Sequence, residues 1–274
     1  MQTGNEIIVK FEADKCNDSN KKLYEKRRNK ILTILSPIGI LLGWQLLVWI
    51  NVLDSRFFPA PTTILIAMIE MIKSGVLLID LKFSLFRIFG GFLLGAIPGL
   101  IIGLTMGLFP IVKIILDPIV NATYPIPKLA IMPLIMILLG LTEFEKMVVI
   151  ALGVIFLVLM NTVAGVINLD KIYMDVAKNY GATKKDYYLT VALPGALPMI
   201  FTGLKLGMGM ALLLIVASEM NGAMQGIGYR IWASYSVFNI PEMFVCFIVM
   251  SILGYVFTAV LDKLERIIIP WKQD

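Results

Sequence analysis

Long apolar runs alternate with short polar segments along most of the chain. Three runs lack any Asp, Glu, Lys or Arg over 20 to 25 residues: 31–50, 88–112 and 147–169. An α-helix rises about 1.5 Å per residue, so each run can cross the hydrocarbon core of a bilayer, which is about 30 Å thick. Further apolar stretches at 113–141, 196–217 and 243–261 bring the expected number of membrane-spanning helices to six.

Two of these predicted spans have internal features that bear on their packing. In 88–112, five glycines repeat every four residues and so share one helix face: Gly91, Gly95, Gly99, Gly103 and Gly107. Small residues in such a stripe let a neighbouring helix approach closely in lipid. The run 113–141 is interrupted by prolines at 118, 125, 127 and 133. Because broken helices at membrane depth line cavities or are buried in protein, we expect this span to be bent.

The segment between the first two spans, 51–82, contains six charged residues and is expected to stay outside the hydrocarbon. Thr62 is a candidate helix cap, and Gly75 is placed as a glycine that ends a helix. With Glu70 and Lys73 inside it, this short helix is too charged to span. We predict an amphipathic helix at the membrane surface.

Composition supports a membrane protein and argues against an enzyme. Hydrophobic residues make up 58% of the 274 residues and charged residues 16%, against about 25% charged in soluble domains. The chain has no histidine, the commonest catalytic base and metal ligand. Cys16 and Cys246 show no metal-ligand spacing, and no G-x-x-x-x-G-K-[ST] motif is present. The predicted class is therefore an all-α, polytopic membrane protein with no catalytic or metal site.

Charge distribution predicts the orientation. Residues 1–30 carry eight Lys or Arg, which by the positive-inside rule makes this tail cytoplasmic. Counting six spans, the loop at 170–194 and the C-terminus also fall in the cytoplasm. The loop has four lysines, whereas the linker 218–241 on the opposite side has one arginine. The number of spans and the distribution of Lys and Arg therefore predict the same orientation for a membrane domain over 31–272.

The loop 170–194 carries an ordered motif. Asp175-Val176-Ala177 is followed after three residues by Gly181, and after nine more by Val191-Ala192-Leu193-Pro194. We expect a helix over 171–180, a turn at Gly181 where glycine permits a left-handed conformation, and a second helix over 184–191 that Pro194 ends. This pattern resembles the E-A-A, three residues, G, nine residues, I-x-L-P loop of ABC-importer permeases, with Asp, Val and Val as conservative departures.

Further segments extend the resemblance to the nitrate/sulfonate/taurine importer permease family over about 31–272, among them 58–61, 84–87, 126–134, 161–166 and 217–220. It implies a type I ABC importer (MetI-like) permease fold in a prokaryotic plasma membrane. It also implies a homodimer in contact with lipid, two ATPase subunits that bind ATP and Mg, and an extracytoplasmic substrate-binding protein, with no nucleic acid partner. The implied cargo is an anion such as nitrate, a sulfonate or taurine. A vitamin precursor, or a stand-alone secondary transporter, remains the alternative.

The resemblance assigns coupling to the ATPase to nine loop residues: Asp175, Val176, Ala177, Gly181, Ala182, Lys184, Val191, Leu193 and Pro194. Candidates for the translocation path come from charged or polar groups within or beside the spans: Lys128, Asn161, Lys205 and Glu219. Intramembrane charges mark either pathways or buried pairs. For these candidates structural pairing remains the alternative to substrate contact.

Overall fold

The computed structural model describes residues 28–29, 32–33 and 35–271 and divides into two compact units, 1–66 and 67–274. We describe each unit by itself. Most of the predicted cytoplasmic tail, including Cys16, lies outside the described residues.

In the first unit, an apolar helix covers Leu35–Trp49. It lies within the predicted span 31–50, of which residues 32 and 33 are also helical and residues 31 and 34 lie outside the described part of the chain. A turn follows in which Arg56 forms an exposed ion pair with Asp54. Helix α2 (Pro61–Lys73) begins in this unit and ends in the second; because it begins at Pro61, Thr62 lies within its first turn and is not the cap that the sequence suggested. Proline suits this position because a helix leaves its first N–H groups unbonded anyway.

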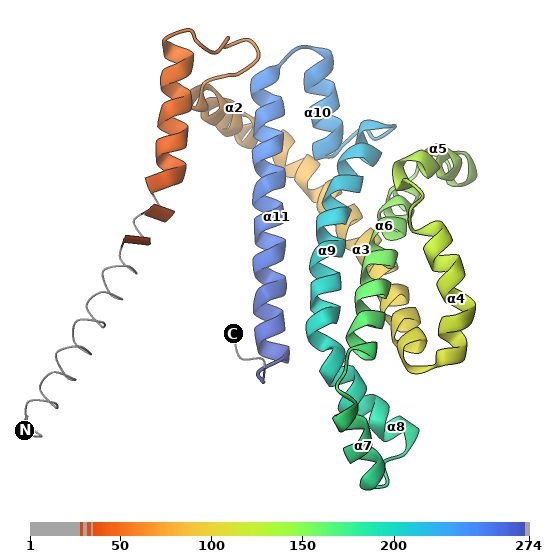
Figure 1. The fold of residues 1–274 in the computed structure, drawn as a ribbon. Helices are drawn as coiled ribbons and strands as arrows, with labels where there is room; N and C mark the ends of the chain where they lie inside the picture. The colour runs from red at the N-terminus through yellow and green to blue at the C-terminus, as the bar shows by residue number, and fades with distance from the viewer. Residues whose placement is uncertain (1–27, 30–31, 34, 272–274) are drawn as a thin grey trace, which may run out of the picture. The chain divides into compact units, whose positions relative to one another are not determined.

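The second unit is a bundle of long helices (Figure 1). Within the described residues, four helices are long and apolar enough to cross a membrane, and a bent pair, α4 and α5, counts as a fifth. The all-α class is confirmed, whereas the sixth span stays a prediction. The elements are α3 (Val76–Leu108), α4 (Pro110–Thr123), α5 (Lys128–Leu139), α6 (Glu143–Ile167), α7 (Lys171–Asn179), α8 (Lys184–Tyr187), a π-helix (Tyr188–Ala192), α9 (Leu193–Met220), α10 (Ile227–Ser236) and α11 (Ile240–Ile268).

Helix α3 begins at Val76, well before the charge-free run at 88–112 that predicted the second span. The extra turns carry Asp80, Ser84 and Arg87, whose side chains are all at least 98% buried. These residues belong to the same helix as the charge-free run, and their polar groups bond to other parts of the bundle. Gly75 has a φ of +77°, the left-handed conformation with which a glycine ends a helix, as the sequence predicted for this position.

The break in the third span is confirmed: α4 and α5 meet at 94°, across residues 124–127. Pro125 and Pro127 lie in this connection. Proline lacks the N–H that would continue the helical hydrogen-bond pattern, so a helix does not pass through the pair.

The glycine stripe of α3 packs against α6, as predicted. A Cβ atom at Gly95 would lie 2.6 Å from the carbonyl oxygen of Ala151, and one at Gly99 would lie 2.7 Å from that of Ile155. No real Cβ approaches a carbonyl oxygen so closely, so any larger residue would push the two helices apart. The stripe therefore sets the distance between α3 and α6.

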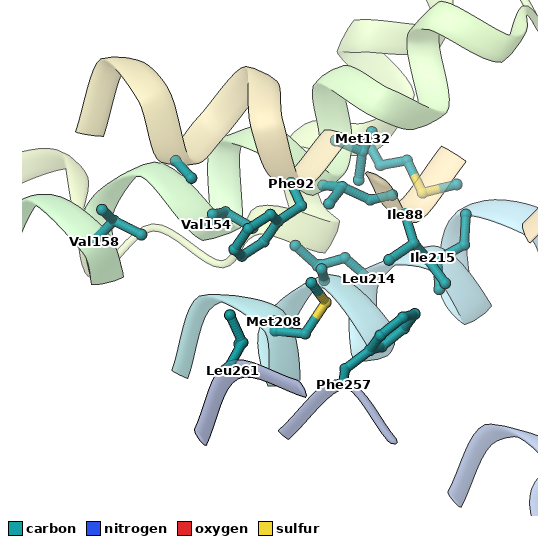
Figure 2. Packing of buried hydrophobic residues seen from close by; sticks show 14 of the residues in the cluster. Ile88, Phe92, Met132, Val154, Val158, Met208, Leu214, Ile215, Phe257 and Leu261 are labelled. Carbon is teal, nitrogen blue, oxygen red and sulfur yellow. The ribbon is translucent and has the colours of Figure 1, made fainter. Parts of the chain in front are cut away.

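The main hydrophobic cluster is formed by residues of α3, α5, α6, α9 and α11 (Figure 2). Phe92 of α3 lies beside Val154 of α6, and Met208 and Leu214 come from α9. Phe257 of α11 also packs edge-to-face on Phe89, with ring centroids 5.3 Å apart. In lipid such packing, together with buried polar bonds, holds helices together.

Candidate functional site

The loop between α6 and α9 folds into the predicted helix–turn–helix and extends beyond the ends of both helices, at the end of the bundle opposite α10 (Figure 1). Its first helix, α7, is capped by Asp170, whose carboxylate accepts a hydrogen bond from the N–H of Ile172 at 3.0 Å. Such a side chain satisfies one of the N–H groups that the helix start leaves free.

Gly181 makes the turn. Its φ is +72°, and two backbone bonds close the end of α7: Gly181 N–H donates to Lys178 O at 2.9 Å, and Ala182 N–H donates to Ala177 O at 3.0 Å. These bonds form a Schellman motif, which requires a left-handed residue at this position. A Cβ at Gly181 would meet nothing within 4 Å, so glycine is required here for its backbone and not for space.

Thr183 and Asp186 open the second helix by bonding to each other. The Thr183 N–H and hydroxyl both donate to the Asp186 carboxylate, at 3.0 and 2.6 Å, and Asp186 N–H donates to the Thr183 hydroxyl at 3.2 Å. This is a capping box with aspartate in place of glutamate. The hydrogen bonds from Thr183 lower the pKa of Asp186 below its usual value.

Pro194 does not end the second helix, contrary to the sequence prediction. The chain passes from α8 through the π-helix, which contains Val191, into α9, where Pro194 occupies the first turn. The wider π-turn accommodates a residue that cannot donate a backbone hydrogen bond. The result is a helix that continues from Lys184 to Met220. Leu193 and Pro194 are half-buried at its entry to the bundle.

The surface of the loop is largely exposed and includes apolar side chains. Asp175 and Val176 are exposed, and Ala177 and Ala182 are half-buried. For Lys184 the structure describes the backbone but not the side chain. Exposed apolar residues of the loop are Ile172, Tyr173, Val176, Tyr180 and Leu189. Apolar side chains gathered on a protruding polar loop are typical of a protein-binding surface.

Lys128 lies at the bend between α4 and α5 and is 92% buried. Its ammonium group donates to the carbonyl oxygens of Thr123, Tyr124 and Ile126 at 2.9 to 3.0 Å. It also lies 4.4 Å from the centroid of the Phe156 ring, within the range of a cation–π contact. Three N–H groups thus meet three carbonyls at the end of α4, so Lys128 caps the break.

Lys205 of α9 forms ion pairs with Asp262 and Glu265 of α11, the latter at 2.5 Å. Asn161 of α6 donates to Leu157 O at 2.8 Å, one turn earlier in its own helix. The structure therefore gives these two path candidates bonds within the protein, and a role in the path stays a prediction for them as for Lys128.

Glu219 is the centre of a polar cluster, which we call the hub: the buried Asp80, Ser84, Arg87 and Glu219, and the exposed Glu143. Glu219 is fully buried and accepts from Arg87 Nη1 at 2.7 Å, from the Ser84 hydroxyl at 2.8 Å and from Gly228 N–H at 2.8 Å. Arg87 also forms a two-pronged pair with Glu143, at 2.5 and 2.8 Å.

Glu219 was recognisable from the sequence as a charge beside a span, but most of its partners were not. Asp80, Ser84 and Arg87 have the i, i+4, i+7 spacing that places them on one face of a helix. That spacing was the available signal, but the charges suggested a segment outside the membrane. Glu143 lies just before the fourth predicted span and was equally inconspicuous.

Within the described part of the chain, no group of three or more His, Cys, Asp or Glu is arranged to hold a metal ion. The carboxylates of the hub bond to arginine, serine and backbone N–H groups instead. The arrangement supplies helix-to-helix bonding rather than acid–base chemistry.

Comparison with known proteins is consistent with a transport component. Residues 91–273 match the family model described as a binding-protein-dependent transport system inner membrane component. The chain is 32% identical to a putative aliphatic sulfonates transport permease protein of Bacillus subtilis, over 92% of this chain and 91% of the relative. It is 30% identical to the taurine transport system permease protein of Escherichia coli, over 92% of this chain and 96% of the relative.

Among solved structures, the chain resembles one described as an inward-facing conformation of the MetNI methionine ABC transporter. The TM-score is 0.55 at 19% identity, over 74% of this chain and 98% of the other. This likeness supports the expected MetI-like fold. The resemblance to nitrate/sulfonate/taurine importer permeases is also confirmed. Since the family model covers more than half of the chain and both relatives align over most of it, the chain belongs to the family of binding-protein-dependent transport system inner membrane components.

Proposed function

We propose that the chain carries a small anion across the plasma membrane and that ATPase subunits dock on its α7–α8 loop. As a permease subunit it supplies the passage, while ATP hydrolysis belongs to a separate chain. The observation that carries the docking proposal is the loop itself: two capped helices that protrude beyond the spans and expose apolar side chains. Apolar side chains exposed together on a protruding loop indicate that a partner covers them.

The remaining assembly follows from this orientation. With the α7–α8 loop in the cytoplasm, the positive-inside rule puts both termini there too. A second copy of the chain would complete the passage, and a substrate-binding protein would deliver the cargo to the end that carries α10. Exposed apolar side chains on α4 and α5, such as Ile111, Ile114 and Ile137, would then face lipid or the second copy.

An aliphatic sulfonate or taurine is the cargo we favour, because the two relatives compared above carry those words in their names. Lys128 and Lys205 add little evidence for an anionic cargo, since both already have bonds within the protein. Transport would proceed by alternation between inward- and outward-facing states, with ATP-driven closure of the ATPases moving the loops of two protomers together.

Docking can be tested at Gly181 with two variants that differ only in backbone preference. Gly181→Asn keeps access to a left-handed conformation, whereas Gly181→Val does not. Because a side chain there meets open space, neither variant is expected to clash. We expect Gly181→Val to insert normally but to lose co-purification with the ATPase and stimulated hydrolysis, and Gly181→Asn to keep both. Normal co-purification and hydrolysis in Gly181→Val would overturn the docking proposal.

A second pair of variants tests the surface rather than the turn. Val176→Arg adds a charge to the exposed apolar surface of α7, and Val176→Leu keeps it apolar. Loss of binding in the first and retention in the second would support an apolar contact. Equal binding would place the contact elsewhere on the loop.

A further inference from the structure

The hub holds four consecutive residues at the start of α10. Asp80 accepts from Gly226 N–H, the Ser84 hydroxyl accepts from Ile227 N–H and Glu219 accepts from Gly228 N–H, each at 2.8 Å. Arg87 donates to Gln225 O at 2.6 Å. Each of these backbone groups therefore meets a side chain from α3 or from the end of α9.

The start of α10 has no space for a residue larger than glycine at position 226. Gly226 has a φ of +126°, and a Cβ there would collide with the Glu219 carboxylate. The Asp80 carboxylate also accepts from Arg230 Nε at 2.8 Å, so α10 is tied to α3 at a second position. Buried polar networks with every member bonded are rigid. The hub thus joins α3, α6, α9 and α10 at the end of the bundle opposite the α7–α8 loop.

The other end of the same helices carries the loop. The chain is helical from Lys184 through Glu219, and α9 alone has 28 residues, which corresponds to about 42 Å. Leu169, in the connection between α6 and α7, packs against Gly195 of α9. Between the two ends, α3 and α6 are held in contact by the glycine stripe.

We propose that α3, α6, α9 and α10 form a rigid lever, with Arg87 and Glu219 as positioning residues that transmit movement of the α7–α8 loop to the far end of the membrane. This inference rests on the proposed docking of the ATPase. Without the hub, the far ends of α3 and α9 would be joined by apolar contacts alone, of the kind that buries Ile88 and Ile215, and no side-chain hydrogen bonds from α3 would fix the start of α10. Movement of the α7–α8 loop would then not move the far ends of these helices together.

Rigidity can be measured within one protomer of the assembled transporter. Asn179 in α7, which is not one of the exposed apolar residues of the loop, and Met224 beside the hub are both exposed. Spin labels at Asn179→Cys and Met224→Cys, with Cys16 and Cys246 replaced by alanine, would report the distance between the two ends. We expect the same narrow distance distribution in the nucleotide-free and ATP-trapped complex. A change of more than roughly 5 Å, about one helical turn, would overturn the lever.

Hub variants test transmission. We expect Glu219→Gln and Arg87→Lys to bind the ATPase as the parent does, but to broaden the label distribution and to lower anion transported per ATP by roughly tenfold, a common size for coupling between distant sites. Ser84→Ala, which removes one hydroxyl, should change the ratio in the same direction but less. Ser84→Ala is the variant to test if Glu219→Gln and Arg87→Lys do not fold.

The control is Phe257→Leu, which loosens the core at α11 but leaves the hub intact. It should lower the melting temperature without lowering transport per ATP. If hub variants of matched melting temperature change the ratio no more than Phe257→Leu, Arg87 and Glu219 only stabilise the fold and the proposal is wrong. Failure of ATPase docking would show separately as lost co-purification in the parent chain, whereas label broadening in Glu219→Gln can be measured without the ATPase.

Discussion

Arg87 and Glu219 are 132 residues apart in the chain and form an ion pair at 2.7 Å that is almost completely buried. Each charge has further partners, so that neither is left without a bond: Arg87 bonds Glu143 and Gln225 O, and Glu219 bonds Ser84 and Gly228 N–H. A buried pair is favourable only under these conditions, because removing two charges from water is expensive. The pair therefore depends on the whole hub.

Removal of one partner should destabilise the protein strongly. We expect Glu219→Ala to lower the free energy of unfolding by about 3 kcal/mol, because it leaves the Arg87 charge and the Ser84 hydroxyl short of acceptors. Thermal unfolding in detergent would measure this. Asp117→Ala is a suitable control, since it breaks a half-exposed pair with Lys113 and should cost about 0.5 kcal/mol or less. Similar losses in both variants would contradict the buried role of Glu219.

Two helix glycines, Gly99 of the α3 stripe and Gly209 of α9, give stability predictions of opposite sign. At Gly99 a methyl group would meet the Ile155 carbonyl, whereas at Gly209 it would meet nothing within 4 Å. Gly99→Ala should destabilise by about 1–3 kcal/mol through overpacking. Gly209→Ala should be neutral or stabilising by up to about 1 kcal/mol, because alanine favours helix. Unfolding of the two variants under the same detergent conditions would check the difference.

Local features were predicted well from the sequence because each rests on neighbouring residues. The glycine spacing in α3, the prolines between α4 and α5 and the turn at Gly181 all act through the backbone within a few residues. The all-α class follows in the same way from the length of the apolar runs. Two local predictions were wrong. Thr62 is not the cap of α2, because the helix already begins at Pro61. Pro194 does not end its helix, because its effect depends on a π-turn that no sequence rule indicates.

The hub could not be predicted because it depends on contacts between distant segments. Asp80 and Arg87 resemble the polar flank of a span, and only the folded bundle shows that they bond to the end of α9 and the start of α10. The same holds for Lys205, whose partners lie on α11. A charge in or near a span has two explanations, and sequence alone did not choose between them.

Lys128 provides a test of those two explanations. Lys128→Met removes three donors from the carbonyls at the end of α4, and we expect a loss of about 2 kcal/mol in the free energy of unfolding. If Lys128 only caps the break, the KM for the anion should stay unchanged while the amount of folded protein falls. Lys113→Met, a half-exposed site on α4, is the control. A large rise in KM with unchanged stability would favour substrate contact.

Acidification should loosen the second helix of the loop. The hydrogen bonds from Thr183 lower the pKa of Asp186 in the folded state. The contribution of Asp186 to stability is therefore complete at pH values above the usual aspartate pKa of about 4, and it is lost as the pH falls through the lowered pKa. At neutral pH, Asp186→Asn and Thr183→Val should each speed hydrogen exchange of the amides at the start of α8. The double variant should be little worse than either, because both remove the same capping box. At a pH below the lowered value the Asp186→Asn and parent chains should exchange alike. Exchange that differs equally at neutral and low pH would show that the Asp186 charge does not hold this helix.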